Sequence, residues 1–370
     1  MHDCIIIGLG AMGSATAWQL RLAGASILAF DQYEAGHSKG SSHGRTRVIR
    51  RVYSEGDLYM PLLSRAYVLW KNMARDAGRD FLIRTGGLDI GYAGAPGVKA
   101  AEDTARTHGI THEHLTAEGV MARYPAFDIP HDYEAVFAPD SGMLLSDAAN
   151  AWMRGQAVKA GADLRWNTRV TDWRREGEHY VVDTRTGSHP ARKLVIAAGP
   201  WTGQFVPELD SALTVERQVV AWFDPLRNLS ALPVFQVEPD DGVRPYVMPP
   251  VNGDGLKIGV YGHFGECGPD MRDGFEPSAR DEGLLRSNAE RWLPGSVGKT
   301  QMMMDCRFTR THDDRFIIGN LPGDPGVTIL SPCSGHGYKF APAIGEAAAN
   351  LVLEHDPKVD LEPFGVIRAV

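Results

Sequence analysis

The first residues of the chain alternate between apolar runs and a glycine-rich turn in a way that predicts a β-α-β unit. Residues 4–7 form a short run rich in isoleucine, which is typical of a strand buried on both faces of a parallel sheet. Small and apolar residues follow at helical spacing over 14–22, and a second apolar run over 26–30 ends at Asp31. This order of strand, turn, helix, strand and acidic residue indicates a nucleotide-binding unit at the start of the chain.

The rest of the chain contains further helical and strand-like stretches. Apolar residues recur at helical spacing over 59–76, 96–108, 145–161 and 342–353. Strands are predicted over 163–173, 179–184, 194–198 and 327–331, and the segment 215–310 is rich in strand. Residues 36–51 predict a loop that opens into a helix. We therefore expect a nucleotide-binding unit assembled from the start, middle and end of the chain, with a strand-rich domain inserted in two pieces.

The turn after the first strand carries the spacing GxGxxG at Gly8, Gly10 and Gly13. The first glycine allows the tight turn, the second lets the backbone approach a pyrophosphate, and the third lets the helix pack closely against the strand. The N-terminus of the helix offers free N–H groups to the phosphates. Asp31 can bind the ribose hydroxyls of an adenosine, and it disfavours the 2′-phosphate of NADP. The motif predicts a dinucleotide but does not choose between NAD and FAD.

Composition and charge narrow the classes of protein. The chain has 370 residues, of which 43% are hydrophobic and 23% charged, and this is typical of a folded protein of two or three domains. The net charge of −8 argues against a general attraction to nucleic acid or to an anionic membrane. No apolar run approaches the ~18 residues of a membrane helix, and the start does not resemble a signal peptide. The four cysteines form no CxxC pair and no zinc spacing, so we expect free thiols, no metal site and a cytoplasmic protein.

Three further segments carry a family resemblance. They are SSHGRTRVIR at 41–50, CRFT at 306–309 and SGHGYKF at 334–340. Together with the glycine motif, they resemble the monomeric sarcosine oxidase and N-methyltryptophan oxidase family, within the glycine oxidase and D-amino acid oxidase superfamily of flavoproteins. The resemblance extends over the whole chain. It implies FAD as the cofactor and a monomeric protein.

The resemblance also implies the architecture. We expect an α/β fold in which a Rossmann-like FAD-binding domain is interleaved with a substrate domain built on a mixed or antiparallel β-sheet. The predicted FAD-binding domain comprises residues 1–77, 140–211 and 311–370, and the predicted substrate domain comprises residues 78–139 and 212–310. The flavin ring is expected to lie between the two domains.

Members of this family oxidise the C–N bond of a secondary amine, usually an N-methyl amino acid, to an imine, and O2 is reduced to H2O2. The resemblance implies that Cys306 holds FAD covalently through the 8α-methyl group of the flavin. Lys257 matches the lysine that activates oxygen, where a positive charge would stabilise developing negative charge. Arg47 matches a residue whose charge stabilises the reduced flavin. His43 matches a histidine near the flavin ring that tunes the flavin rather than transferring a proton.

The substrate end of the site is also implied by the resemblance. Arg50 and Lys339 match the pair that binds the substrate carboxylate, for which an arginine fork and the point charge of a lysine are suited. Tyr246 matches a tyrosine of the substrate pocket. The same carry-over gives the residues expected to bind FAD, which are Gly8, Gly10, Met12, Gly13, Asp31, Ser41, His43, Arg47, Cys306, Gly335, His336, Gly337 and Lys339. The turn at 335–337 is expected to offer backbone N–H groups to the carbonyl edge of the flavin.

Two positions depart from the family pattern. Phe308 stands where the sarcosine-active members have a tyrosine, and Tyr261, with His263 nearby, stands where they have a histidine. Both residues are still expected to contact the substrate. Because the loss of a hydroxyl and of an imidazole changes the pocket wall, sarcosine itself is not transferred as the substrate.

Three alternatives stay open at this point. The first is a flavin amine dehydrogenase that passes electrons to a quinone or to another protein, and Lys257 favours the oxidase over it. The second is a non-catalytic nucleotide-binding subunit of an amine-oxidising complex, against which the joint presence of Arg50, Lys257, Cys306 and Lys339 argues. The third is an NAD-dependent dehydrogenase, which the glycine turn near the C-terminus disfavours. The sequence gives neither the amine nor the choice between hydride transfer and a polar adduct.

Overall fold

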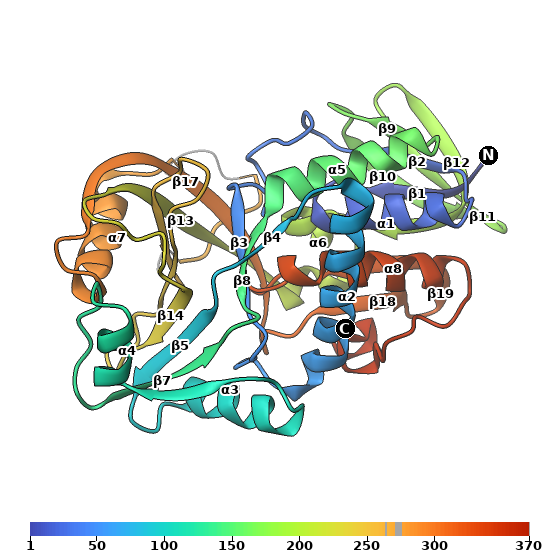
Figure 1. The fold of residues 1–370 in the computed structure, drawn as a ribbon. Helices are drawn as coiled ribbons and strands as arrows, with labels where there is room; N and C mark the ends of the chain where they lie inside the picture. Colours follow the sequence, from blue (N-terminus) through green and yellow to red (C-terminus); the bar gives the residue numbers. More distant parts are fainter. Residues whose placement is uncertain (263–264, 271–275, 370) are drawn as a thin grey trace.

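The computed structural model describes residues 1–262, 265–270 and 276–369, and it arranges them around two large β-sheets (Figure 1). Each of the two sheets has eight strands in the described part of the chain, and a third sheet of three strands accompanies them. Figure 1 shows the two large sheets at opposite ends of the molecule, with the three-stranded sheet between them. The chain passes between the two ends several times, as expected for interleaved domains.

The first large sheet contains the predicted nucleotide-binding unit. Strand β1 (His2–Ile7) lies at its centre, with β2 (Ile27–Phe30) on one side and β12 (Gly187–Ile196) on the other, all parallel. Further parallel strands are β9 (Asp163–Arg165) beside β2 and β19 (Asp324–Ser331) beside β12. The antiparallel strands β10 (Val170–Glu176), β11 (His179–Thr184) and β18 (Ile317–Leu321) complete it.

A group of helices packs together beside this sheet, namely α1 (Ala11–Leu22), α2 (Met60–Ala77), α5 (Ser146–Lys159) and α8 (Ala341–Val352). Helix α1 lies between α5 and α8, and α2 packs against α8 (Figure 1). Gly345 of α8 is the point of closest approach, because a Cβ there would lie 2.6 Å from the backbone of Ala15. The C-terminal helix therefore closes onto the first helix of the chain, and it brings the segment before it next to the glycine turn.

The second large sheet is mixed. In order it contains β17 (Val297–Thr311), β13 (Leu213–Pro225), β16 (Leu256–Val260), β15 (Pro245–Met248), β14 (Val234–Glu238), β5 (Gly87–Tyr92), β7 (Tyr133–Ala138) and β6 (Glu113–Thr116). All neighbours pair antiparallel except β14 and β5, which are parallel. Helix α3 (Pro96–Thr107) contacts β5 and β7, and α4 (Ala117–Arg123) contacts β6 and β7. Helix α7 (Ala279–Trp292) contacts β13, β16 and β17.

The three-stranded sheet corrects one sequence-based expectation. Residues 36–51 do not open into a helix: they form an irregular loop of bends that leads into strand β3 (Thr46–Ile49). This strand pairs with β8 (Gly142–Leu145), which also pairs with β4 (Leu82–Arg84). The β-branched residues of β3 favour a strand, and the partner lies about a hundred residues away in the sequence, which a local pattern does not reveal.

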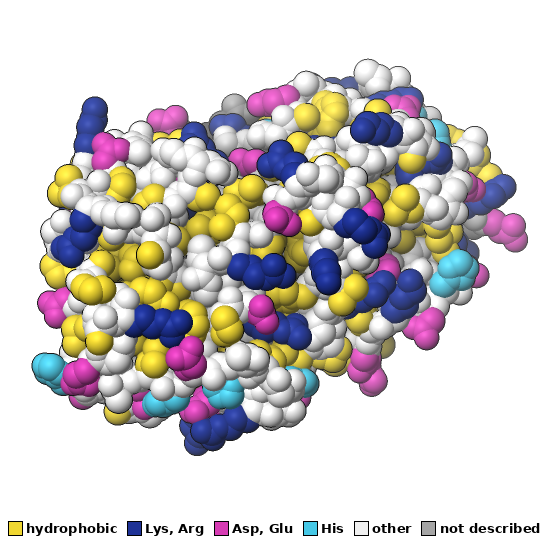
Figure 2. All heavy atoms as spheres, in the orientation of Figure 1, with side chains coloured by type: hydrophobic (Ala, Val, Ile, Leu, Met, Phe, Trp, Pro, Cys, Tyr) yellow, Lys and Arg dark blue, Asp and Glu magenta, His cyan; other side chains and the backbone are white. Residues whose placement is uncertain are grey.

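Each large sheet is built from separate segments of the chain and has its own clusters of buried hydrophobic residues. The strands of the first large sheet come from 2–30, 163–196 and 317–331, and those of the second come from 87–138 and 213–311. One cluster of buried residues fills the space beneath the second sheet, and two others flank the first. The face in Figure 2 carries Lys and Arg side chains interspersed with Asp and Glu. In the described residues, no helix is both long enough and apolar enough to cross a membrane.

Candidate active site

One cavity lies where the two large sheets meet. It is lined by the turn after β1, by the segment that leads into β3, by strands of the second sheet and by the turn between β19 and α8. The predicted residues that line it are Gly8, Gly10, Met12, Asp31, Ser41, His43, Arg47, Arg50, Tyr246, Lys257, Tyr261, Cys306, Phe308, Gly335, His336, Gly337 and Lys339. The structure therefore brings together groups that are more than three hundred residues apart in the sequence.

Gly13 is the one predicted residue that lies beneath the cavity rather than in its wall. A Cβ at Gly13 would lie 1.9 Å from the carbonyl oxygen of Gly8, so only glycine fits there. Gly8 itself has φ +97°, a conformation that favours glycine. These two positions let α1 begin directly under the turn, with Gly10 as its N-cap. The N–H of Ala11 at the start of α1 donates to the hydroxyl of Ser42 at 2.9 Å, and the adjoining helix N-terminus fits the pyrophosphate of a dinucleotide.

Asp31 lies at the end of β2 and is 7% exposed. Its carboxylate accepts hydrogen bonds from the backbone N–H of Leu9, at 2.9 Å, and of Tyr33, at 3.1 Å. Each carboxylate oxygen has a second lone pair, so the group can still accept from a ribose diol. Asp31 thereby fixes the glycine turn and also presents a polar edge to the cavity.

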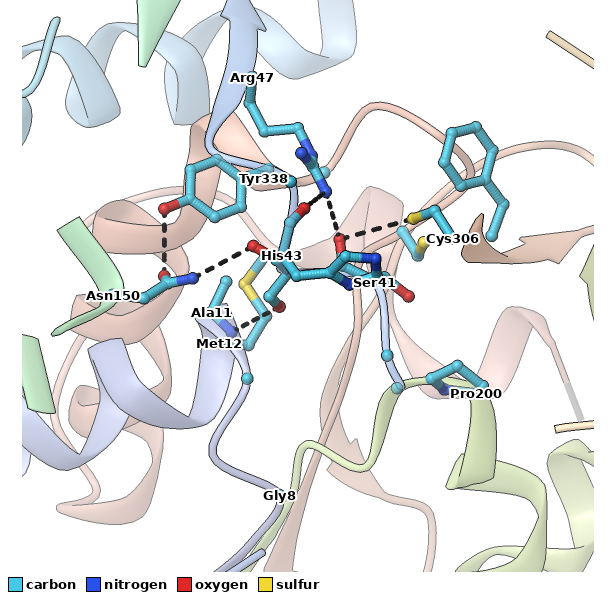
Figure 3. A pocket seen from close by; sticks show the side chains of 18 of the residues that line it. Gly8, Ala11, Met12, Ser41, His43, Arg47, Asn150, Pro200, Cys306 and Tyr338 are labelled. Carbon is cyan, nitrogen blue, oxygen red and sulfur yellow. Dashed lines mark hydrogen bonds between the residues drawn. The ribbon is translucent and has the colours of Figure 1, made fainter. Parts of the chain in front are cut away.

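The guanidinium of Arg47 and the thiol of Cys306 both face the carbonyl oxygen of Ser41 (Figure 3). The guanidinium of Arg47 donates to the backbone carbonyls of Ser41 and Thr46, both at 2.9 Å, and to that of His43. It has no carboxylate partner among the described residues. The charge of Arg47 is therefore not neutralised by an ion pair, and it faces the cavity.

His43 is a neutral, buried imidazole. Burial, helped by the charge of Arg47, lowers its pKa to about 4. Nε2 lies 2.6 Å from the carbonyl oxygen of Asp305, which can only accept, so Nε2 carries the proton. Nδ1 is then an acceptor, and it has no hydrogen-bond partner in the described part of the chain. This orphaned atom at the cavity wall fits a site that a polar group completes.

Cys306 is in β17, and its thiol is the sulfur that faces Ser41 in Figure 3. It is 6% exposed, and Sγ lies 3.9 Å from the carbonyl oxygen of Ser41. Burial raises the pKa of the thiol to about 11, although the charges of Arg47 and Lys257 act in the opposite direction. All four cysteines are free thiols, as expected. Cys333 also lines the cavity.

Lys257 is in β16 and is 2% exposed. Its ammonium donates to the carbonyl oxygens of Gly44, at 2.7 Å, and Thr46, at 2.8 Å. Nζ also lies 4.8 Å from the centre of the Trp222 ring. Burial, and then the neighbouring charge of Arg47, hold the pKa of Lys257 well below its usual range. An ammonium has three donors, so one N–H is left for a group in the cavity.

Arg50 and Lys339 both lie near the Tyr53 ring. The Arg50 guanidinium is 5.4 Å and the Lys339 ammonium 5.2 Å from the centre of that ring. Lys339 donates to the carbonyl oxygen of His336 at 2.7 Å, which leaves two of its donors for a ligand. Burial lowers the pKa of Lys339 to about 7, although the carboxylate of Glu55 opposes this shift. Both members of the predicted carboxylate-binding pair therefore lie at one ring beside the cavity, and Lys339 keeps donors for a ligand.

Two carboxylates that the sequence reasoning did not single out already hold Arg50. Its Nη1 donates to Oδ1 of Asp89 at 2.6 Å and to the hydroxyl of Ser54 at 3.0 Å, and its Nη2 donates to Glu55. Burial would lower the pKa of Arg50, but these two carboxylates raise it, so the residue stays charged. Asp89 breaks the apolar pattern Leu88-Asp89-Ile90 of its strand, and this was the available signal.

Aromatic side chains form another part of the cavity wall. The rings of Tyr246 and Tyr261 are 4.9 Å apart between centres, and those of Tyr261 and Phe308 are 6.4 Å apart. Tyr246 lies over Gly259, where a Cβ would come within 2.3 Å of its hydroxyl. Burial raises the pKa of Tyr261 to about 12, so it acts as a neutral phenol. His263, noted beside Tyr261 in the sequence, lies outside the described residues.

The glycine turn between β19 and α8 packs against this wall. A Cβ at Gly335 would lie 3.0 Å from the Phe308 ring, and one at Gly337 would lie 1.6 Å from the carbonyl oxygen of Pro332. The expectation of free N–H groups here is wrong for two residues, since His336 and Gly337 both donate to the carbonyl oxygen of Cys333. The tight turn consumes these donors internally. The side chain of His336 instead contacts the hydroxyl of Tyr53, 2.6 Å from Nδ1.

The family of this chain follows from its similarity to known proteins. The sequence profile described as FAD dependent oxidoreductase matches residues 3–351. The chain belongs to the FAD-dependent oxidoreductase family. Monomeric sarcosine oxidase from Bacillus sp. (strain B-0618) is 33% identical over 99% of this chain and 96% of the relative. N-methyl-L-tryptophan oxidase from Citrobacter koseri is 34% identical over 99% of both chains. The predicted resemblance is thus confirmed, and the chain lies within the group of flavin-dependent amine oxidases.

A solved structure supports the fold assignment. NikD, an amino acid oxidase of nikkomycin biosynthesis, superposes with a TM-score of 0.87 over 98% of this chain and 97% of its own, at 21% identity. The predicted fold class, a Rossmann-like unit combined with a second, largely antiparallel sheet, is confirmed. The residues present also fit FAD, because the glycine turn leaves room for a pyrophosphate, Asp31 faces the cavity, and Nδ1 of His43 awaits a donor.

Proposed function

We propose that this protein oxidises the C–N bond of a secondary amine that carries a carboxylate, with N-methyl amino acids as the first candidates and with O2 as the electron acceptor. The observation that supports this most is the content of one cavity. It contains a carboxylate-binding pair at one place, an aromatic wall beside it, and a thiol with two cations at another. In this reaction, bound FAD takes up two electrons from the amine and delivers them to O2, which gives an imine and H2O2.

The chain's own residues bind and orient the substrate in this proposal. Lys339 and the remaining donors of Arg50 bind the carboxylate, and the carboxylates of Asp89 and Glu55 hold the guanidinium in place. The rings of Tyr246, Tyr261 and Phe308 exclude water from the amine. The neutral phenols and the neutral His43 offer no strong base, so we expect the amine to react in its unprotonated form.

The cofactor-facing residues divide into two roles. Cys306 is proposed to hold the cofactor through a thioether bond, and Met12, Ser41 and the glycine turn border the same cavity. Arg47 and Lys257 supply positive charge or N–H donors where negative charge develops. We expect the division into FAD-binding and substrate domains at the predicted boundaries. The monomeric state and the cytoplasmic location stay predictions.

A single experiment tests this proposal. The purified yellow protein is mixed anaerobically with a panel of N-methyl and cyclic amino acids, and the bleaching of the flavin absorbance is followed; air is then admitted and peroxide is measured. Bleaching followed by rapid recovery and stoichiometric peroxide is the expected result. Bleaching with recovery only on addition of a quinone would favour the dehydrogenase instead. Failure of every carboxylated amine to bleach the flavin would contradict the proposed substrate class.

The lowered pKa of Lys339 makes a prediction about pH. Its ammonium predominates below about pH 7 and is lost as the pH rises through about 7, so carboxylate binding is expected to weaken above this pH. Furan-2-carboxylate is a suitable probe because it has no amine that titrates in this range. We expect its Kd, measured from the flavin spectrum, to rise about tenfold between pH 7 and pH 8.5. In Lys339→Met the Kd should be high and independent of pH over that range. A Kd that does not depend on pH in the unmodified protein would contradict the assignment of Lys339 to the carboxylate site.

A further inference from the structure

Three residues on neighbouring strands of the second sheet lie in one row across the floor of the cavity. Gln236 of β14 is the register partner of Asp89 on β5 and of Tyr246 on β15. Side chains at one register position of adjacent strands point to the same face of the sheet. Tyr246 and Gln236 both line the cavity, and Gln236 is half-buried. The proposed function uses Tyr246 but gives Gln236 no role.

The hydrogen bonds of Gln236 determine which end of its amide faces the cavity. Nε2 lies 2.5 Å from Oδ1 of Asp89 and 3.4 Å from the hydroxyl of Ser54. An ionised carboxylate can only accept, so the amide nitrogen must face Asp89 and the amide oxygen must point away from it. No donor among the described residues reaches that oxygen. Gln236 therefore offers an unused acceptor to whatever the cavity binds.

Asp89 places this acceptor next to the carboxylate-binding arginine. Its Oδ1 receives both Nε2 of Gln236 and, at 2.6 Å, Nη1 of Arg50. Asp89 is 2% exposed, and its Oδ2 has no partner in the described part of the chain. A buried carboxylate held by two donors on one oxygen fixes both of them. The amide oxygen of Gln236 and the guanidinium of Arg50 thus have a common anchor, and both face one ligand.

We propose that Gln236, positioned by Asp89, is a specificity-determining residue that accepts a hydrogen bond from an N–H or O–H donor beside the substrate carboxylate. This inference rests on the proposed function, in which Arg50 binds that carboxylate. In an N-alkyl amino acid the nearest donor is the α-amine N–H. The pair therefore selects secondary amines over tertiary amines, because a neutral tertiary amine has no N–H to donate. A ligand with a lone pair at that position would face the amide oxygen unfavourably.

Two aromatic carboxylates of the same shape test this directly. Pyrrole-2-carboxylate has an N–H beside its carboxylate, and furan-2-carboxylate has a ring oxygen in the same place. Binding of each to the holoenzyme is measured from the change in flavin absorbance at pH 6.5, where Lys339 is protonated. We expect pyrrole-2-carboxylate to bind about tenfold more tightly, which is the effect of one additional neutral hydrogen bond.

The chain offers a matched control for the variant. Gln236→Met keeps the length of the side chain and is expected to reduce the tenfold ratio to about one by weakening only the pyrrole ligand. Gln204 also lines the cavity and also donates to a carboxylate, Oδ2 of Asp270 at 3.2 Å, so Gln204→Met is the same change at another place. Its ratio should stay at about ten. Asp89→Leu should lower the ratio as well, since the amide of Gln236 is then free to rotate.

The outcomes separate this inference from the function on which it rests. Equal binding of the two ligands by the unmodified protein, or an unchanged ratio in Gln236→Met, would overturn the inference alone. If neither ligand altered the flavin spectrum, the carboxylate site itself would be overturned, and the inference with it. The reduction of the flavin by N-methyl amino acids is measured separately, and it tests the oxidase independently of either ligand.

Discussion

Replacement of Lys257 by methionine is expected to slow the reaction of the reduced enzyme with O2 by about 10²–10³-fold, the usual cost of removing one preorganised electrostatic donor. Reduction by the amine should change less than about threefold, because Lys257 lies on the side of Cys306 and Arg47 rather than beside Arg50 and Lys339. The two half-reactions are measured separately by anaerobic mixing with substrate and by mixing the reduced protein with oxygenated buffer.

The physical reason lies in the partners of the ammonium. Among the residues that the structure describes, Lys257 is paired with the carbonyls of Gly44 and Thr46 and with the Trp222 ring alone. Because no carboxylate forms an ion pair with it among the described residues, its proton is available to neutralise negative charge that develops on oxygen. Because its pKa is lowered, the ammonium of Lys257 gives up a proton more readily than an ordinary lysine. Negative charge that develops on oxygen nearby would raise this pKa and favour the protonated form.

A matched variant and a folding control separate an effect on the reaction with O2 from a general loss of structure. Lys99→Met changes an exposed lysine on α3, and both half-reactions should keep their rates in it. In Lys257→Met the two buried carbonyls lose their donor, so the midpoint of thermal unfolding is recorded alongside the kinetics. An unchanged rate of the oxidative half-reaction in a folded Lys257→Met protein would exclude the role of Lys257 in the reaction with O2. It would then favour the alternative of a flavin amine dehydrogenase.

Local features of the fold could be predicted from the sequence because their signals are local. The strand, glycine turn and helix around Gly8 and Gly13 follow from hydrophobic spacing and from the need for a residue without a Cβ. Helix α1 begins at Ala11 rather than at residue 14, because the last residues of the glycine motif already adopt helical geometry. Helix α7 was missed although Ser278 and Asp281 form a capping box, which the sequence shows as S-x-x-D.

The floor of the substrate site could not be predicted in the same way. Asp89 and Gln236 are 147 residues apart, and they meet only because β5 and β14 pair in parallel at a particular register. Pairing between distant strands is set by the packing of the whole sheet and not by either segment. The family resemblance identified Arg50 and Lys339 but not Asp89. The signal for Asp89 is in this chain's own sequence, where a charged residue interrupts an otherwise apolar strand.

Cys306→Ala is expected to abolish covalent attachment of the flavin completely. After acid precipitation the unmodified protein should give a yellow pellet, whereas the variant should release all of its flavin into the supernatant. The net reaction replaces the S–H bond of Cys306 and one C–H bond of the flavin 8α-methyl group by a C–S bond, and two electrons and two protons pass to O2 as H2O2. Formation of this bond requires the thiolate, and Arg47 and Lys257 both lower the pKa of the thiol.

Cys333 provides the discriminating control because it is a second thiol that lines the same cavity. It accepts a hydrogen bond from the backbone N–H of Thr309 at 3.3 Å, while Cys306 faces the carbonyl of Ser41 beside Arg47. The charges of Arg47 and Lys257 both lower the pKa of Cys306, whereas of these two only Arg47 acts on Cys333, so Cys333→Ala should keep the yellow pellet. A yellow pellet from Cys306→Ala together with a colourless one from Cys333→Ala would move the attachment to Cys333. A yellow supernatant from the unmodified protein would leave both thiols as packing residues around a reversibly bound flavin.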